Sequence, residues 1–198
     1  MRFFSVLMLL LPVWLFAAES SDDQGVAIFA GGCFWCTEAD FDKMPGVLST
    51  ISGYIGGELE RPSYEQVSRG GTGHLEAVKV VFDPGKTDFS RLLEAFWQTI
   101  DPLDAGGQFC DRGHHYRSAI FYLNENQRQL AQNSKAALAS SGKLSGDIVT
   151  LVLPAGSFWP AEEYHQDYAK RNPLRYSYYR SRCGRDQRLE EVWKKTSP

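Results

Sequence analysis

The chain has 198 residues, of which 43% are hydrophobic, 23% are charged and 13% are aromatic. This composition supports one sizeable core and excludes disordered and fibrous proteins. The formal net charge is −3, from 21 Lys and Arg residues against 24 Asp and Glu residues. Nucleic-acid-binding proteins carry a basic surface that this balance lacks, so we expect no nucleic-acid partner.

The first twenty residues have the layout of a secretory signal. Arg2 is followed by an apolar run over residues 3–18 and then by the small residues Ala18 and Ser20. We expect cleavage after one of these two residues. The alternative is an uncut membrane anchor, but the run is short for a span that needs about 20 apolar residues.

Removal of residues 1–20 would leave a single domain over residues 21–198, with a C-terminal tail over residues 174–198. We expect this domain to be exported, to the periplasm, with no stable membrane association after cleavage. In that compartment thiols meet an oxidising environment.

Strand and helix patterns alternate along the remaining chain. Alternating apolar residues predict strands, while helices are predicted from apolar residues at helical spacing or from residues typical of helix starts and stops. The strands are expected at residues 25–30, 47–55, 74–82, 118–123 and 147–153, and the helices at residues 33–43, 89–100, 124–142 and 160–172. Residues 58–73 and 103–116 are expected to be long loops. The order predicts an α/β (α+β) domain in two layers, with helices packed against one mixed sheet.

Four cysteines are too few for a disulfide scaffold, so each must be considered by position. Cys33 follows a predicted strand and two glycines and opens a predicted helix. Unpaired N–H groups at a helix start stabilise a thiolate, so Cys33 is a candidate nucleophile; the alternative is a buried structural cysteine. Cys36 lies one helical turn on, where it could form a redox pair with Cys33. A zinc site is disfavoured because Cys110 and Cys183 supply no second CxxC pair.

Glu76 is the second unusual residue. In its predicted strand it shares a face with Val78, Val80 and Phe82, so burial of that face would raise the pKa of its carboxyl. A carboxyl that stays protonated near neutral pH can act as a general acid. The alternative is an acid at the strand end that reaches water.

Further polar and aromatic candidates lie near these residues. Tyr64, Asp111 and Tyr116 lie in the two predicted loops, where ordinary turn or anchor roles are the alternative. Phe34 and Trp35 could line an apolar substrate pocket beside the thiol, or could belong to the core.

Taken together, five segments resemble the peptide methionine sulfoxide reductases of the A type. The matches are in chain order and span roughly residues 27–173. They are Gly31-Gly-Cys-Phe-Trp35, Gly53-Tyr-Ile-Gly-Gly57, Gly71-Thr-Gly-His-Leu-Glu-Ala-Val78, Tyr116-Arg-Ser118 and Pro160-Ala-Glu-Glu-Tyr-His-Gln-Asp-Tyr168.

The resemblance implies a ferredoxin-like two-layer core and reduction of the S epimer of methionine sulfoxide, free or in proteins. It also implies a role for each matched residue. By resemblance, Cys33 is the nucleophile and Glu76 is the proton donor. The hydroxyls of Tyr64 and Tyr116 hold the sulfoxide oxygen, and Asp111 is an acid beside them. Phe34 and Trp35 form the pocket for the methyl group.

The reaction that the resemblance implies leaves Cys33 as a sulfenic acid, which condenses with a second thiol to a disulfide. An external dithiol, thioredoxin-like, then restores the enzyme, with no metal and no bound cofactor. Many members of the family carry glycine at the position of Cys36 and a Gly-rich tail unlike that around Cys183. We favour Cys36 as the resolving thiol, while Cys183, or a relay through both, stays open and Cys110 is unassigned.

Two other functions fit part of the same pattern. A general thiol-disulfide oxidoreductase would use Cys33 and Cys36 and would not need Glu76. A metal-binding module would use the cysteines and histidines, although His114 and His115 are adjacent and therefore point in different directions.

Overall fold

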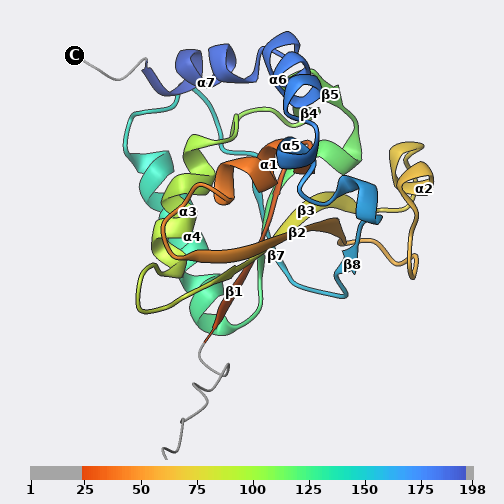
Figure 1. Ribbon diagram of the computed structural model, residues 1–198. Helices are drawn as coiled ribbons and strands as arrows, with labels where there is room; N and C mark the ends of the chain where they lie inside the picture. Colours follow the sequence, from red (N-terminus) through yellow and green to blue (C-terminus); the bar gives the residue numbers. More distant parts are fainter. Residues whose placement is uncertain (1–23, 195–198) are drawn as a thin grey trace, which may run out of the picture.

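The computed structural model describes residues 24–194 of the chain. Its centre is a six-stranded sheet in the order β7-β6-β1-β3-β2-β8, beside which lies a two-stranded hairpin of β4 and β5 (Figure 1). The strands are β1 (Gly25–Gly31), β2 (Val47–Ile55), β3 (Leu75–Phe82), β4 (Gly107–Gln108), β5 (Asp111–Arg112), β6 (Ser118–Tyr122), β7 (Leu151–Pro154) and β8 (Trp159–Pro160).

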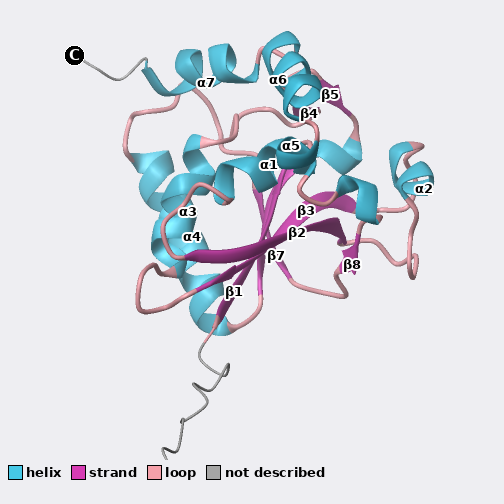
Figure 2. Ribbon diagram, viewed as in Figure 1, coloured by secondary structure: helices cyan, strands magenta, loops and turns pink. Residues whose placement is uncertain are grey.

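The helices that accompany this sheet differ greatly in length (Figure 2). The α-helices are α1 (Phe34–Phe41), α2 (Tyr64–Ser68), α3 (Phe89–Gln98), α4 (Glu125–Ser140), α5 (Tyr168–Arg171), α6 (Pro173–Arg182) and α7 (Arg185–Lys194). Two short 3₁₀ turns, η2 (His114–Tyr116) and η3 (Glu163–His165), complete the described elements.

β1 is the central strand and pairs antiparallel with β3 on one side and with β6 on the other. The sheet is mixed because β7 pairs parallel to β6. Successive residues of a strand point to opposite faces, so Ala27 and Phe29 join one core while Ile28 and Ala30 join another.

The larger core lies between the sheet and the helices α1, α3 and α4. Phe29 stacks there on rings from two helices, with centroids 5.0 Å from Phe41 and 4.9 Å from Phe96. The smaller core, on the opposite face, is covered by Ala155 and Phe158 from the segment that follows β7. The predicted mixed sheet with helices packed against it is therefore confirmed.

Most predicted elements are found within a few residues of the expected bounds, but both predicted loops contain structure. Ser63 begins α2 with a capping box, in which its hydroxyl accepts from Gln66 and the Gln66 side chain accepts from the Ser63 N–H. The second loop contains the β4–β5 hairpin. Both are short local elements that hydrophobic periodicity does not detect.

The helix predicted over residues 160–172 is wrong. Pro160 lies in β8, an edge strand paired with Gly53, where the missing N–H of proline is tolerated. The chain then makes η3, and Asp167 adopts a left-handed conformation (φ 52°) before α5 begins. This left-handed residue interrupts the helix that a proline at position 160, acids after it and the Asn172-Pro173 stop had suggested.

The tail, for which the sequence predicts no pattern, forms α6 and α7. Gly184, with φ +69°, follows Cys183, the C-cap residue of α6, and lets the chain turn into α7. Within residues 24–194, no helix combines the length and apolar character needed to cross a bilayer. The predicted signal over residues 1–20 lies outside the described residues.

Candidate active site

Cys33 lies where β1 gives way to α1. The turn depends on Gly32, which has φ +85° and packs so closely on Gln108 that an added Cβ would lie 2.6 Å from the Gln108 Cβ. Cys33 is the N-cap residue of α1, and its carbonyl accepts the N–H groups of Cys36 and Thr37. Its side chain is only 6% exposed.

The ionisation of the two thiols differs from the expectation for a helix start. Burial raises the pKa of the Cys33 thiol, and the hydrogen bond with Cys36 and the charges of Glu76 and Asp111 act in the same direction. The pKa of Cys36 is lowered to about 7, chiefly by its hydrogen bond with Cys33 and further by the charge of Arg185. Loss of hydration and nearby acids therefore outweigh the helix start at Cys33.

Glu76 lies in β3 on the face that is covered by helices, and it is 2% exposed. Its Oε2 accepts the backbone N–H of Phe34 at 3.0 Å. Burial raises the pKa of the Glu76 carboxyl to about 8, although that hydrogen bond opposes the change. The carboxyl is therefore mostly protonated at neutral pH, next to the first residue of α1.

A cavity of about 230 Å³ opens over these groups. It brings together all the predicted nucleophile, acid, hydroxyl and pocket residues, which come from five parts of the chain. They are Cys33, Phe34, Trp35, Tyr64, Glu76, Asp111 and Tyr116, joined by Tyr179 of α6. Of the predicted resolving residues, Cys36 is buried in the first turn of α1, and Cys183 lies at the end of α6.

Trp35 is fixed by aromatic neighbours from the segment after β8. Its indole stacks on Tyr168 with centroids 3.7 Å apart, and its Nε1–H donates to His165 Nδ1 at 3.0 Å. The imidazole also lies 4.9 Å from the ring of Phe34. Burial lowers the pKa of His165, which favours the neutral ring that this hydrogen bond requires.

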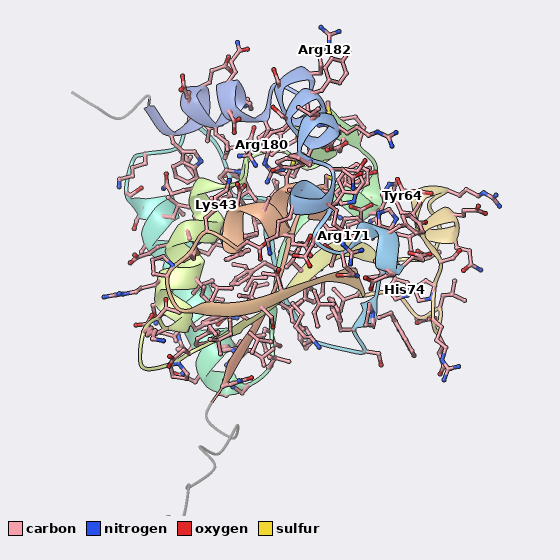
Figure 3. The ribbon with its side chains drawn as sticks, in the orientation of Figure 1. Lys43, Tyr64, His74, Arg171, Arg180 and Arg182 are labelled. Carbon is pink, nitrogen blue, oxygen red and sulfur yellow. A yellow bond between two sulfur atoms is a disulfide. The ribbon has the colours of Figure 1, made fainter. Side chains whose placement is uncertain are left out.

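Glu162 connects the segment after β8 to Tyr54 of β2 and Tyr64 of α2. Its carboxylate accepts the Tyr54 hydroxyl at 2.9 Å and the Tyr64 N–H at 2.8 Å. Figure 3 shows where Tyr64 lies, on α2 at the edge of the molecule. Both Glu162 and His165 stand in a segment quoted for the family resemblance, but the sequence alone assigns them no role.

Comparisons with known proteins agree on one family. The family model for peptide methionine sulfoxide reductase matches residues 25–197. The chain belongs to this family. It is 52% identical over 173 residues to peptide methionine sulfoxide reductase MsrA of Bacillus licheniformis, which covers 87% of this chain and 96% of that protein. It is thereby an oxidoreductase.

Solved structures support the same conclusion. Methionine sulfoxide reductase A of Corynebacterium diphtheriae superposes with a TM-score of 0.69 at 34% identity, over 78% of this chain and 77% of that one. Mxr1 of Saccharomyces cerevisiae in complex with Trx2 shares the fold, with a TM-score of 0.52 at 22% identity over 78% and 91% of the two chains.

In this member of the reductase family, Tyr179 is the cavity residue that sequence reasoning missed. It is one of several tyrosines in a tail without clear periodicity, so no local signal distinguishes it. Its hydroxyl donates to Asp111 Oδ2 at 2.6 Å, and its ring meets Trp35 edge-on with centroids 5.7 Å apart.

The remaining two cysteines form a disulfide. Cys110, in the β4–β5 hairpin, is bonded to Cys183, 73 residues later. Together with Asp111 they make the group of potential metal ligands found among residues 24–194. Because both sulfurs are engaged in the disulfide, neither is available as a thiolate ligand in this structure.

Proposed function

We propose that the protein reduces the S epimer of methionine sulfoxide, free or within oxidised proteins, to methionine. The observation that carries this proposal is the protonated Glu76 carboxyl and the Cys33 thiol, which line one small cavity. A sulfoxide becomes a good electrophile when its oxygen is protonated, so the acid and the nucleophile must both reach the substrate.

In the first step the sulfoxide oxygen lies between Glu76 and the hydroxyls of Tyr64 and Tyr116, while Phe34 and Trp35 enclose the methyl group. Glu76 donates its proton to the oxygen, and the Cys33 sulfur attacks the sulfoxide sulfur. The S–O bond of the substrate then breaks, methionine is released, and the oxygen stays on Cys33 as a sulfenic acid. The substrate sulfur is reduced, the Cys33 sulfur is oxidised, and the thiol proton returns to Glu76. Asp111, which lines the cavity and accepts the Tyr179 hydroxyl, completes the set of polar groups.

In the second step the Cys36 thiol attacks the sulfenic acid, so that a Cys33–Cys36 disulfide forms and water leaves. Two observations favour Cys36 over Cys183. Cys36 is hydrogen-bonded to Cys33 and its pKa is about 7, whereas Cys183 is already bonded to Cys110. A thiol with a pKa near ambient pH is also a favourable attacking group.

An external dithiol of the thioredoxin type then reduces the Cys33–Cys36 disulfide. This part of the proposal is supported by the structural relative Mxr1, which has been solved in complex with Trx2. The cycle uses only thiol chemistry and needs no bound cofactor.

The test uses resolved epimers of methionine sulfoxide with dithiothreitol as reductant. We expect the S epimer to be consumed and the R epimer to be left, with no turnover by Cys33→Ser. Equal consumption of both epimers, or full activity in Cys33→Ser, would contradict the proposal. Disulfide reduction in insulin that survives Glu76→Gln, without sulfoxide reduction, would instead identify a general thiol-disulfide oxidoreductase.

We propose further that the protein is exported and processed after Ala18 or Ser20. The layout of residues 1–20 supports this, and so does the Cys110–Cys183 disulfide, since disulfides persist in oxidising compartments. Expression of the full chain in a bacterium, followed by periplasmic extraction and intact-mass measurement, should give the processed mass. A full-length mass in the cytoplasmic fraction would contradict export.

A further inference from the structure

The C-terminal helices α6 and α7 contribute to the reaction site as well as to the fold. We propose that Tyr179 of α6 is a positioning residue for the sulfoxide-reducing step, held over the cavity by the Cys110–Cys183 disulfide. This inference rests on the proposed function. It gives a role to Cys110, which the reaction cycle leaves unused.

The Tyr179 side chain lies at the candidate active site. It lines the same cavity as Cys33 and Glu76. Its hydroxyl donates to Asp111 Oδ2 at 2.6 Å, and its ring packs edge-on against Trp35. Burial raises the pKa of Tyr179, and the charge of Cys33 and hydrogen bonds with Asp111 and Cys33 act in the same direction. Its hydroxyl therefore stays protonated and donates to an acid in the cavity that also holds the reacting sulfur.

The Cys110–Cys183 disulfide joins the two segments that carry the partners of this hydrogen bond. Cys110 immediately precedes Asp111 in the hairpin, and Cys183 follows Tyr179 by one helical turn, since its N–H donates to the Tyr179 carbonyl at 2.9 Å. Figure 1 shows α6 lying beside β4 and β5. The disulfide therefore holds the β4–β5 hairpin and α6 together next to the Tyr179–Asp111 hydrogen bond.

Ion pairs also hold α6 against α1 and α7. Arg180, the residue after Tyr179, bonds Asp40 of α1 at 2.9 Å and Asp186 of α7 at 2.7 Å. Its side chain can be followed between α6 and α1 in Figure 3. Because Asp40 belongs to the helix that Cys33 begins, this ion pair couples α6 to the nucleophile's own helix.

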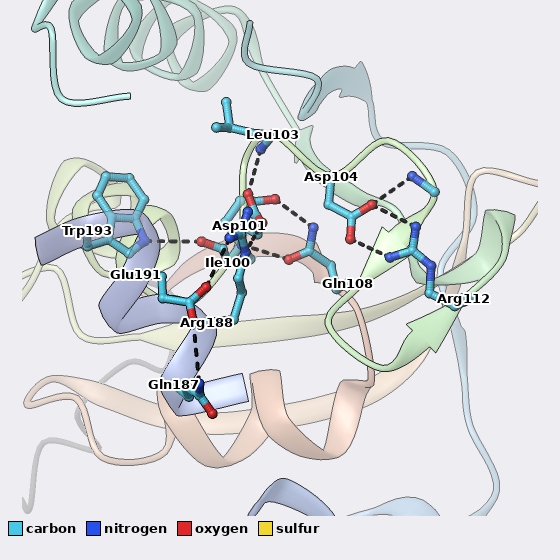
Figure 4. Close-up of polar contacts among 11 residues, drawn as sticks. Ile100, Asp101, Leu103, Asp104, Gln108, Arg112, Gln187, Arg188, Glu191 and Trp193 are labelled. Atoms are coloured by element: carbon cyan, nitrogen blue, oxygen red, sulfur yellow. Dashed lines mark hydrogen bonds and ion pairs between the residues drawn. The ribbon is translucent and has the colours of Figure 1, made fainter. Parts of the chain in front are cut away.

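The helix that follows fastens the same region to the loop after α3. Arg185 is 1% exposed and donates to the carbonyls of Gly31 and Thr99. Arg188 pairs with Asp101 at 2.8 Å, and the Trp193 indole donates to the Ile100 carbonyl, as Figure 4 shows. The disulfide is therefore one of several contacts that hold α6 and α7 in place, and it is the contact next to the cavity.

A hydroxyl that orients Asp111 in the cavity of the reacting Cys33 sulfur acts on the chemical step more than on substrate binding. Loss of one hydrogen bond to a charged group changes a rate by about tenfold. We therefore expect Tyr179→Phe to slow sulfenic acid formation about tenfold. The half-saturating substrate concentration should change by no more than about twofold, because the ring stays in place.

The experiment follows methionine release in a single turnover by rapid quench, without added reductant. The enzyme is prepared with Cys33 and Cys36 reduced and the Cys110–Cys183 disulfide intact, which peptide mass spectrometry verifies. Tyr178→Phe is the matched control, since its side chain is 69% exposed on the same helix. Equal rates for Tyr179→Phe and Tyr178→Phe would overturn the proposal, as would an effect confined to the half-saturating concentration.

A second variant tests the disulfide and remains informative if Tyr179→Phe fails to fold. Cys110→Ser/Cys183→Ser should slow the same step two- to fivefold, and should have no further effect when combined with Tyr179→Phe. Equal slowing in both backgrounds would show that the disulfide acts independently of Tyr179. If the wild-type enzyme released no methionine, the proposed function itself would fail, which is a separate outcome.

Discussion

The two cysteine pairs of this protein differ in almost every physical respect. Cys33 and Cys36 are three residues apart, buried in the first turn of α1 and free. Cys110 and Cys183 are 73 residues apart and bonded, and they join a hairpin to the C-terminal helices. Cys33 of the first pair lines a cavity together with the protonated Glu76 carboxyl, whereas the second pair forms a structural cross-link next to Asp111 at the same cavity. Reactivity therefore follows the environment of a thiol, while the number of cysteines indicates little.

The largest effect is expected at Glu76, the acid that lies in the cavity of Cys33. Glu76→Gln should lower kcat/KM for the S sulfoxide by about 10²- to 10³-fold, because the amide cannot donate the proton in general acid catalysis. In the wild type, activity should fall as the pH rises through about 8, where Glu76 loses its proton. A pH–rate profile of both proteins checks this, and an unchanged alkaline limb in Glu76→Gln would contradict it.

The same substitution should stabilise the fold at alkaline pH. The pKa of Glu76 is raised in the folded state, so the folded protein binds the proton more tightly and loses stability as the pH rises from about 4.5 to about 8. Above that range the buried charge costs on the order of 5 kcal/mol, which Gln avoids. Urea unfolding at pH 9 should favour Glu76→Gln, and equal stability there would show that Glu76 is not desolvated.

Loss of Cys36 should separate sulfoxide reduction at Cys33 from the later regeneration of the Cys33 thiol. Cys36→Ser should release one methionine per enzyme at close to the wild-type rate, because Cys33 is intact. With a thioredoxin system as reductant, its steady-state rate should fall by about 10- to 100-fold, since the sulfenic acid has no adjacent thiol. Peptide mass spectrometry after one turnover identifies the resolving bond. A Cys33–Cys183 disulfide in the wild type would reverse the assignment of the two pairs.

The bonded pair should show its main effect in stability. Cys110→Ser/Cys183→Ser opens a long loop and should lower the free energy of unfolding by about 2–4 kcal/mol. Chemical denaturation of the variant and the wild type, both with Cys33 and Cys36 reduced, measures the difference. No change in the denaturation midpoint would mean that the other contacts of α6 and α7 hold these helices without the disulfide.

The smallest expected effect is at His165. His165→Phe keeps the aromatic packing but removes the acceptor of the Trp35 indole N–H, so we expect KM to rise about two- to fivefold with kcat nearly unchanged. Steady-state kinetics with the S epimer measure the split. A fall in kcat alone would place His165 in the chemical step.

The sequence predicts the local features because their causes are local. Alternating apolar residues define β1, β2 and β3, and two glycines before Cys33 predict the turn into α1. The position of Glu76 on the helix-covered face of β3 follows from the same alternation. The five segments that resemble the family extend this to the candidate residues of the cavity.

Tertiary contacts decide the rest. The left-handed Asp167 and the edge pairing of Pro160 break a segment that helix start and stop signals predict as one helix. Tyr179 reaches the cavity because α6 is fastened to α1 and to the β4–β5 hairpin by contacts between residues far apart in the chain.

The sequence by itself determined the family, the mixed α/β fold and the candidate nucleophile and acid, since these depend on short motifs and on strand alternation. Only the tertiary structure decided that burial raises the pKa of Cys33, that Cys110 joins Cys183, and that the tail forms a wall of the cavity. The physical reason is that desolvation and covalent pairing depend on neighbours distant in the chain, and no local pattern records them.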